Sequence, residues 1–431
     1  MLDRVTFDST NESVPYTFEM STAASVEILG SFFAGSGRGL YASAIRGSTD
    51  FLAVRNSTFV GFSRPLEAFG SLVEMSHVNY RDNDAGPRLA VQSLTFFNLT
   101  VENSTGAGLE VLGVPWVRGE RLLARGNGGV GARFSNVADL ALATSEVYEN
   151  LQGGLLLESC VAALTHTSVA GNSGFGLRLQ GGGRASIDDL QANGNSGSGL
   201  AAEDLDELLV RGALVYNGLG RGIELTRVSV VRLDGAEFYD NAAFGLLAVD
   251  VGNLTAAGAR FAGNGVSHVG LQGWTVAWFV DGVMERSPGD AVSLDGTARG
   301  TFIAMATDGS VARVYAAQAS YAYLLNSTFA PPLVLDAARV DIAWNLSVVA
   351  RRESGAPVVG ATVRVVNAYD EVAASEGTGA DGSTATFTAM TRSVFAAGDF
   401  LAFSPHTFNA SLPGGGGARL AVDVDRYMVV N

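Results

Sequence analysis

The amino-acid sequence predicts an all-β protein: a right-handed parallel β-helix solenoid of about a dozen coils of about 23 residues, followed by a small β-sandwich. Asn and Gly residues recur at a nearly constant interval through the middle of the chain. Between them lie short stretches in which apolar and polar residues alternate, as they do in strands. The repeat ends near Pro331-Pro332. We therefore expect residues 1–335 to form the solenoid and residues 340–431 the sandwich.

Two columns of residues define the repeat. Asparagines that precede a Gly-rich turn and an aliphatic residue lie at Asn103, Asn127, Asn150, Asn172, Asn195, Asn217 and Asn241. The glycines before the aliphatic residue lie at Gly108, Gly131, Gly154, Gly176, Gly199, Gly222 and Gly245, at intervals of 22 or 23. Asn tolerates the left-handed backbone conformation and can hydrogen-bond its own turn. We therefore predict that the seven asparagines stack as a structural ladder.

The residues between these columns indicate strands rather than helices. A period near 23 also occurs in leucine-rich repeats, but those need a helical segment in each repeat. Here pairs such as Leu155 and Leu157 alternate with other residues and are bounded by Gly, Asn and Asp turns. A strand followed by Asn, a Gly turn and Gly-Leu resembles the coil of the pectate-lyase-like β-helix superfamily. This resemblance covers roughly residues 1–335, rests on periodicity, and implies a fold rather than an activity.

The C-terminal segment has a different pattern. The stretches GAPVVGATVRV and TGADGSTATF resemble the carboxypeptidase-regulatory or prealbumin-like β-sandwich of secreted and surface proteins. Val363 and Val365 alternate with polar residues, as in half-buried antiparallel strands. The resemblance implies a spacer or adhesion module at residues 340–431.

Composition excludes several function classes. A net charge of −15 argues against binding to nucleic acid or to anionic membrane surfaces. All 28 cationic residues are Arg, which excludes lysine chemistry. No apolar run is long enough for a membrane-spanning helix. The first residues lack the features of a signal peptide, so any secretion signal is expected to lie outside this chain.

One polar column is a candidate catalytic site. Six positions before five successive ladder asparagines lie Arg121, Thr144, His166, Asp189 and Arg211. If the protein is a polysaccharide lyase or glycosidase, the expected catalytic residues are His166, Asp188, Asp189 and Arg211. No catalytic motif of the β-helix enzymes is present in the sequence. The alternative is a surface row of paired charges.

Two further groups have both a functional and a structural interpretation. Glu203, Asp204, Asp206 and Glu207 form an acidic cluster that suits Ca²⁺, although a solvated turn has the same composition. No other cofactor is expected. Trp274 and Trp278 are candidates for stacking on a sugar ring, whereas their structural interpretation is core filling or a cap.

The sequence points to a role outside the cell. Candidate N-glycosylation sites are Asn11, Asn56, Asn98, Asn253, Asn326, Asn345 and Asn409. The leading hypothesis is a non-catalytic secreted or cell-surface protein for adhesion or for binding a polysaccharide or another glycan of the cell envelope. The alternatives are a carbohydrate-active β-helix enzyme and a purely structural spacer.

Overall fold

The structure is a computed structural model that describes residues 2–3, 6–9, 16–35, 43–70, 72–286, 288–308, 312–412, 414–424 and 428–430. Its strands form a β-solenoid of about 12 turns of roughly 23 residues, with a small antiparallel sheet near the C-terminus. The predicted fold class is confirmed. The chain divides into two compact units, residues 1–254 with 260–269 and residues 255–259 with 270–431. The candidate glycosylation site Asn11 lies outside the described residues.

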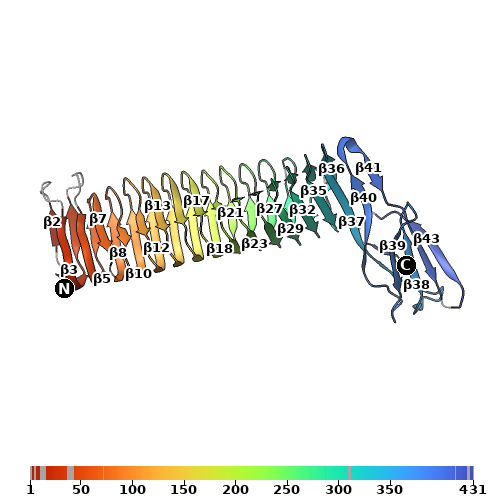
Figure 1. Cartoon of the computed structure of the whole chain (residues 1–431), viewed down its shortest axis with the longest axis horizontal. Coiled ribbons are helices and arrows are strands. Elements are labelled where there is room, and N and C mark those ends of the chain that lie inside the picture. Colours follow the sequence, from red (N-terminus) through yellow and green to blue (C-terminus); the bar gives the residue numbers. More distant parts are fainter. Residues whose placement is uncertain are drawn as a thin grey trace. The chain divides into compact units, whose positions relative to one another are not determined.

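In the first unit, each coil contributes strands to three parallel sheets (Figure 1). Sheet 1 contains β7 (Arg64–Phe69), β9 (Arg88–Ala90), β11 (Leu109–Leu112), β13 (Val130–Ser135), β15 (Gly153–Glu158), β17 (Phe175–Gln180), β19 (Leu200–Glu203), β22 (Ile223–Thr226) and β25 (Leu246–Val249). The first parts of six long strands belong to sheet 2 and their second parts to sheet 3: β8 (Leu72–Arg81), β10 (Ser93–Glu102), β12 (Trp116–Arg125), β14 (Asp139–Tyr148), β16 (Ala162–Ala170) and β18 (Arg184–Asn193). Later coils divide this strand into β20 (Glu207–Arg211) and β21 (Leu214–Tyr216), then β23 (Val230–Asp234) and β24 (Glu237–Tyr239), with β27 (Arg260–Ala262) following in sheet 3.

The remaining solenoid strands of the N-terminal region also pair in parallel. They are β1 (Leu2–Asp3), β2 (Thr6–Ser9), β3 (Tyr16–Leu29), β4 (Phe32–Gly35), β5 (Ser43–Arg55) and β6 (Thr58–Val60). Two strands, β26 (Asn253–Ala257) and β28 (Val269–Gln272), contain residues of both units.

Single residues with a left-handed backbone mark the three corners of most coils in the first unit. Corner 1 follows sheet 1, corner 2 lies between sheets 2 and 3, and corner 3 follows sheet 3. In the coil that begins with β17, these residues are Gly181, Asp189 and Gly194, with φ of 64°, 59° and 61° respectively. Residues with a Cβ atom are disfavoured in this conformation, glycine is not, and Asn and Asp tolerate it best among the others. This preference explains why Gly, Asn and Asp recur between the strands.

A buried asparagine column follows corner 3. The Asn150 Oδ1 accepts hydrogen bonds from the backbone N–H (3.0 Å) and the Nδ2 (2.9 Å) of Asn127 in the preceding coil. The Nδ2 of Asn150 donates to the Ala124 carbonyl (3.2 Å) and to the Oδ1 of Asn172 (3.0 Å). Asn172 bonds to Asn195 in the same way, and Asn241 to Asn264. Each side chain thereby satisfies backbone groups that are buried away from water.

Two of the seven predicted ladder residues lie outside this column, and the prediction is corrected for them. Asn103 and Asn217 sit one residue earlier, at corner 3, with φ of 56° and 54°. Their places in the column are taken by Ser104 and Gly218, whose backbone N–H groups donate to the next asparagine. Asn suits both positions, because it tolerates the left-handed conformation and also serves as a buried hydrogen-bonding side chain.

The glycine column has a steric cause. A Cβ atom at Gly154 would lie 2.3 Å from the Gly176 carbonyl oxygen of the next coil, and one at Gly222 would lie 2.4 Å from that of Gly245. No L side chain fits at these contacts without moving the backbone. This contact keeps neighbouring coils in register as far as Gly245, and His268 occupies the equivalent position in the next coil.

Inward-facing apolar side chains stack between coils to form the core. Phe33, Phe59 and Tyr80 form one stack, with ring centroids 4.6 Å and 4.9 Å apart, and Phe238 stacks on Phe261 at 4.8 Å. Complete burial raises the pKa of the Tyr80 hydroxyl well above its usual range. These distances match the spacing of neighbouring strands, so like residues in successive coils meet face to face.

In the second unit, short parallel strands continue the solenoid pattern and end at a long strand, β37 (Arg339–Val348). The others are β29 (Val276–Val280), β30 (Val283–Glu285), β31 (Val292–Leu294), β32 (Arg299–Ile303), β33 (Ala306–Thr307), β34 (Arg313–Ala316), β35 (Tyr321–Leu325) and β36 (Ala330–Val334). The first half of β37 pairs in parallel with β35, and the strand also pairs antiparallel with β40 (Phe387–Val394). One strand thus belongs to both the parallel and the antiparallel structure.

A buried carboxylate fixes this junction. Asp341 accepts hydrogen bonds from the Tyr321 hydroxyl (2.9 Å), the Arg339 Nε (2.7 Å) and the Ser393 hydroxyl (2.6 Å). Burial and the bond to Asp341 raise the pKa of Tyr321. These three partners compensate the desolvation of the Asp341 charge. Removal of one of them would leave the buried charge poorly compensated and destabilise the fold.

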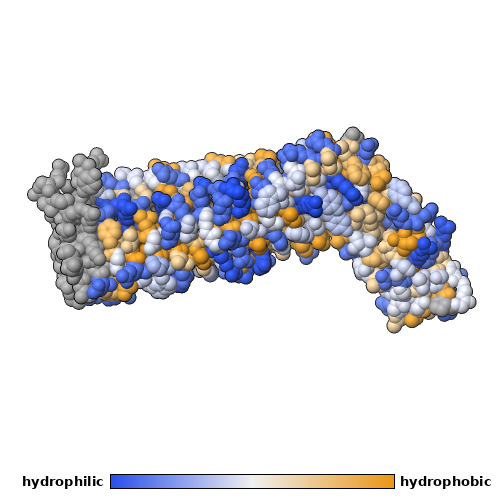
Figure 2. Space-filling view, in the orientation of Figure 1, coloured by the Kyte–Doolittle hydropathy of each residue, from blue (hydrophilic) through white to orange (hydrophobic). Residues whose placement is uncertain are grey.

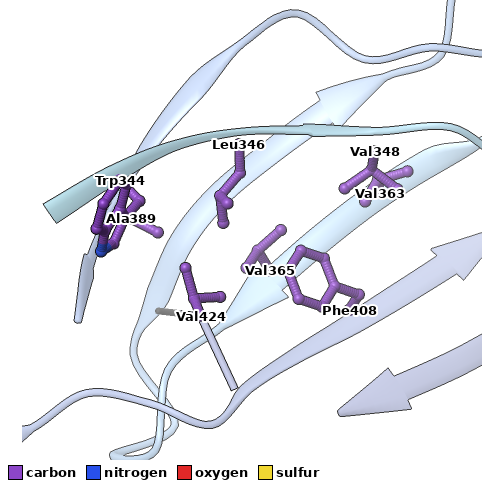
Figure 3. Packing of buried hydrophobic residues seen from close by; sticks show 8 residues of the cluster. All are labelled: Trp344, Leu346, Val348, Val363, Val365, Ala389, Phe408 and Val424. Atoms are coloured by element: carbon purple, nitrogen blue, oxygen red, sulfur yellow. The ribbon is translucent and has the colours of Figure 1, made fainter. Parts of the chain in front are cut away.

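The C-terminal module packs two sheets against each other. One sheet has the order β39 (Val372–Gly377), β38 (Thr362–Val366), β42 (His406–Ser411), β43 (Gly417–Val422), and is antiparallel. The other contains β37, β40, β41 (Phe400–Ala402) and β44 (Met428–Val430), with the short 3-10 turn Ala396–Gly398 between β40 and β41. The core between them contains Trp344, Leu346, Val363, Val365 and Phe408 (Figure 3).

The asparagine column makes a first prediction. Asn150→Ala removes the acceptor of two buried Asn127 donors and the donor to Ala124, and each group left unsatisfied costs about 1–3 kcal/mol. We expect the free energy of unfolding to fall by about 3 kcal/mol or more in urea denaturation. The matched control is Asn103→Gly, which changes an exposed asparagine outside the column and should shift stability by less than about 0.5 kcal/mol. Equal losses in both variants would contradict the column's role.

The corners make a second prediction. Thr144 is β-branched and has φ of 52°. Gly212 occupies the equivalent corner 2 position three coils further on, with φ of 61° and open space around it. Thr144→Gly should raise the free energy of unfolding by up to about 1 kcal/mol, and Gly212→Ala should lower it by about the same amount. Thermal unfolding of both variants measures the two shifts. Shifts of the same sign would contradict a conformational cause.

His406 in β42 makes a third prediction. Its ring is fully buried, and neither nitrogen has a hydrogen-bond partner of normal geometry among the described residues. Burial is the larger influence and lowers the pKa of His406, while the backbone of Met390 acts in the opposite direction. The unfolded chain then binds the proton more tightly, so stability is lost as the pH falls below about 6.5. In the His406→Phe variant, the free energy of unfolding should fall less steeply between about pH 7 and pH 5 than in the wild type. An equal slope in both proteins would contradict the prediction.

Candidate functional site

The predicted catalytic residues lie at corner 2 and beside it, exposed on the outer surface. His166 and Asp189 are corner residues of neighbouring coils, and the His166 Nε2 lies 3.9 Å from the Asp189 Oδ2. Asp188 ends the sheet 2 part of β18 and pairs with Arg211 at 3.3 Å. The His166 side chain is 70% exposed, so no enclosed site surrounds it.

The alignment of Arg211 with Asp189 is corrected. Arg211 lies opposite Asp188 in the neighbouring strand, and Gly212 occupies the corner position that corresponds to Asp189. Asn217 lies one residue before the asparagine column, so the sixth residue before it, Arg211, lies one residue before the corner. The four residues therefore form two separate surface pairs.

A polar groove lies on the outer face of sheet 1, away from these two surface pairs. Arg178, Ala201 and Glu224 follow one another across β17, β19 and β22, and Gln180, Glu203 and Thr226 form the next outward row. Asp204 and Arg227 are the corner 1 residues beside this second row. The side chains come from successive coils because outward positions of parallel strands in register lie next to each other.

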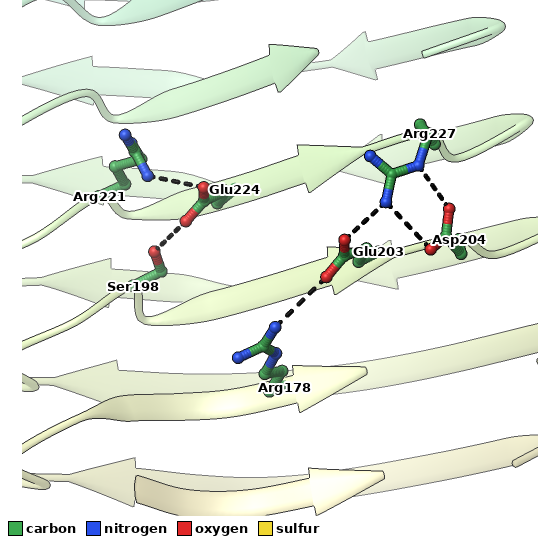
Figure 4. Close-up of polar contacts among 7 residues, drawn as sticks. All are labelled: Arg178, Ser198, Glu203, Asp204, Arg221, Glu224 and Arg227. Atoms are coloured by element: carbon green, nitrogen blue, oxygen red, sulfur yellow. Dashed lines mark hydrogen bonds and ion pairs between the residues drawn. The ribbon is translucent and has the colours of Figure 1, made fainter. Parts of the chain in front are cut away.

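Arginine and carboxylate groups alternate through this groove (Figure 4). Glu203 contacts Arg178 at 3.3 Å and Arg227 at 2.6 Å. Arg227 also binds Asp204 at 2.7 Å, and this hydrogen bond lowers the pKa of Asp204. On the other side of the groove, Glu224 accepts hydrogen bonds from Arg221 (2.6 Å) and from the Ser198 hydroxyl (2.7 Å).

The floor and one wall of the groove consist of small residues. Ala201 lies between Arg178 and Glu224, so the surface is lower there. The wall is the stack of loops that follow the asparagine column, with Gly197 and Gly220 in successive coils. A Cβ atom at Gly220 would approach the Gly197 carbonyl oxygen to 2.6 Å, so glycine allows the loops to stack. Phe175 lines one end, and the groove encloses about 620 Å³.

The four acidic residues considered for Ca²⁺ do not form one ligand set. Glu203 and Asp204 bind Arg227, and Glu207 contacts Arg184 at 3.2 Å. Among the residues that the structure describes, no group of three or more His, Cys, Asp or Glu side chains is placed to hold a metal ion. Three of the four carboxylates, those of Glu203, Asp204 and Glu207, already have cationic partners.

The two candidate tryptophans belong to the second unit. Trp278 points outward from β29 and is 37% exposed, in one row with Thr301 and Tyr323 of the following coils. Trp274 lies in the preceding turn and is 53% exposed. On the face in view, hydrophilic and hydrophobic side chains are interspersed (Figure 2).

The candidate glycosylation sites differ in accessibility. Asn56, Asn98 and Asn253 are exposed. Asn326, Asn345 and Asn409 are partly buried, and the Asn326 Oδ1 accepts a hydrogen bond of 2.7 Å from the Asn345 backbone.

Sequence reasoning missed four groove residues, namely Arg178, Arg221, Glu224 and Arg227. The glycine column contains the signal that finds most of them. The second residue after Gly176, Gly199 and Gly222 belongs to the first row of the groove. The fifth residue after Gly199 is Asp204, and the fifth after Gly222 is Arg227. Arg221 lies in the loop before Gly222, where no periodic pattern marks it.

One family model agrees with the fold. Residues 121–272 match the family described as "Right handed beta helix region". Among solved structures, the full-length tailspike protein 2 of the Escherichia coli O157:H7 bacteriophage CAB120 has 7% sequence identity and a TM-score of 0.21. The match covers 94% of this chain and 64% of the tailspike, so the chain spans less than two thirds of that protein. No curated protein matches the sequence. Within the described residues, there is no helix of the length and apolar character needed to cross a membrane.

Proposed function

We propose that the protein is a non-catalytic glycan-binding β-helix protein, and that the groove on sheet 1 binds a segment of a polysaccharide or another cell-envelope glycan. The observation that carries this proposal is the alternation of guanidinium and carboxylate groups in one groove, with Glu203 between Arg178 and Arg227 and Glu224 beside Arg221. The groove is also within the size range of ligand sites.

Sugar hydroxyl groups suit this chemistry. A hydroxyl donates one hydrogen bond and accepts others, whereas guanidinium only donates and an ionised carboxylate only accepts. Neighbouring hydroxyls of one ring can therefore bind an adjacent Arg and Glu. The three arginines are balanced by Glu203, Asp204 and Glu224, which favours a ligand without strong net charge. A solenoid repeats its outer face about every 4.8 Å, and this suits a linear polymer with a regular repeat.

Binding is favoured over hydrolysis. A glycosidase needs one carboxylic acid that holds a proton at working pH, and burial in an apolar site is the usual cause. Glu203 and Glu224 instead accept short hydrogen bonds from arginines and are partly exposed. The enzyme alternative retains one supporting observation, since the two glutamates lie on neighbouring strands of one groove.

The proposal extends to location and to the remaining parts of the chain. We place the protein outside the cell or at its surface, with glycosylation expected first at the exposed sites Asn56, Asn98 and Asn253. We propose that residues 340–431 are a carboxypeptidase-regulatory-like module that acts as a spacer or attachment element, and that the solenoid comprises residues 1–335. Trp274 and Trp278 are proposed as an accessory stacking surface in the second unit.

Affinity electrophoresis in gels with soluble neutral and uronate polysaccharides tests the groove. At least one neutral polysaccharide should retard the wild-type chain. The double variant Glu203→Gln, Glu224→Gln should lose most of this retardation, because the acceptors for sugar hydroxyls are weakened. Exposed ion pairs are worth about 0–1 kcal/mol, so the variant should remain folded.

The matched control is Arg184→Gln, which breaks an exposed Arg–Glu pair on sheet 2. It should migrate like the wild type. Equal retardation of the double variant and the wild type would exclude the groove as the binding site. Release of reducing ends from any of the polysaccharides, lost in the double variant, would show an enzyme instead.

A further inference from the structure

A second groove lies on sheet 2 of the first unit, away from the one on sheet 1. It encloses about 380 Å³ over β10, β12, β14 and β16. Its floor consists of Ala141, Ala143 and Ala163, which are the outward residues of two neighbouring strands. In the preceding coil, the equivalent positions carry Arg118 and Glu120. The change from long to small side chains produces the depression.

An aromatic wall closes one end. Phe97 lines the groove, and two corner 2 residues hold its ring. His77 meets it edge-on, with ring centroids 5.3 Å apart, and the Arg121 guanidinium lies 5.1 Å from its centroid. Both contacts lie in the range of favourable aromatic and cation–π interactions. The ring is therefore held in a fixed position on an otherwise open face.

The backbone beside this groove is strained. The corner 2 residues of its four coils are Asn98, Arg121, Thr144 and His166, with φ between 50° and 58°. Past Asp189, the same corner is occupied by glycine, at Gly212 and Gly235. Asn tolerates this conformation, whereas Arg, Thr and His each cost roughly 1–2 kcal/mol in it, and such costs persist where the surrounding structure holds the residue in place. The groove therefore lies beside a run of non-glycine corner residues, which extends to His77 and Asp189 in the flanking coils.

We infer that this groove is a second sugar-binding site, which takes one pyranose ring of a neutral glycan. The apolar face of the ring would lie on the alanine floor and against Phe97. Its hydroxyls would reach the hydroxyl groups of Thr95 and Thr165 and the charged groups of Arg118 and Glu120 at the rim.

The charges around the groove favour a neutral ligand. Arg118 is paired with Asp139, and Arg121 lies 3.9 Å from Glu120. Two cations thus face two anions, with no excess to attract an acidic sugar. This site does not depend on the groove of sheet 1, and the protein would hold two sugar segments on two faces of the same unit.

The test separates strain from binding. The Arg121→Gly variant removes the strained backbone and one support of Phe97. We expect its melting temperature to rise while its affinity for sugar falls about fivefold or more, the scale of one lost aromatic contact. The control is Glu149→Gly, an exposed left-handed corner 3 residue with φ of 58° outside the groove. It should gain stability and keep its affinity.

The measurement is isothermal titration with neutral tetrasaccharides of glucose, galactose, mannose and xylose. All variants also carry Glu203→Gln and Glu224→Gln, so the sheet 1 groove does not contribute to the signal. The protein is produced in a host without N-glycosylation, because Asn98 beside the groove is itself a candidate site. Failure of all four sugars to bind would overturn the inference. Unchanged affinity in Arg121→Gly, or a lower melting temperature, would also overturn it.

Discussion

The buried asparagine column is the interaction on which the rest of the first unit depends. A solenoid coil must turn several times, and each turn leaves backbone groups inside without a partner from the sheets. Asn127, Asn150 and Asn172 satisfy those groups and bond to one another in sequence, so they connect each coil to the next. A buried donor or acceptor without a partner is costly. The column therefore fixes how successive coils are aligned, and the aromatic stacks and outer rows inherit that alignment.

The register of the inner column decides which outer side chains meet. Glu203 reaches both Arg178 and Arg227 only because the three lie at related positions of three successive coils. Exposed ion pairs of this kind contribute little to stability. Folding therefore depends little on these pairs, and the proposed glycan site would give those around the groove a role. The same reasoning applies to sheet 2, where strained corner residues support Phe97 at a cost in stability.

The sequence was sufficient for the fold, since the recurring Gly, Asn and alternating apolar residues each have one physical role in a parallel coil. It was insufficient for the site for two reasons. Asn217 stands at a corner and not in the column, because Asn suits both positions, and counting from it displaced Arg211 by one residue. The groove itself depends on Ala201 being small between two long side chains, and on loops that stack at Gly197 and Gly220. The depth of the surface at each position depends on packing between coils, and it does not repeat with the period of the sequence.

The glycine column is the more reliable measure of register for a physical reason. Gly154 and Gly222 are required by contact with the backbone of the next coil, and no other residue satisfies that contact. Asparagine, in contrast, is favoured by two different positions in each coil. A position with a single permitted residue carries more information on alignment than one with a preferred residue. In this solenoid, steric exclusion at the inner surface therefore defines the coordinates, and the outer surface is free to vary from coil to coil. That freedom allows two grooves of different chemistry to arise on one repeated scaffold.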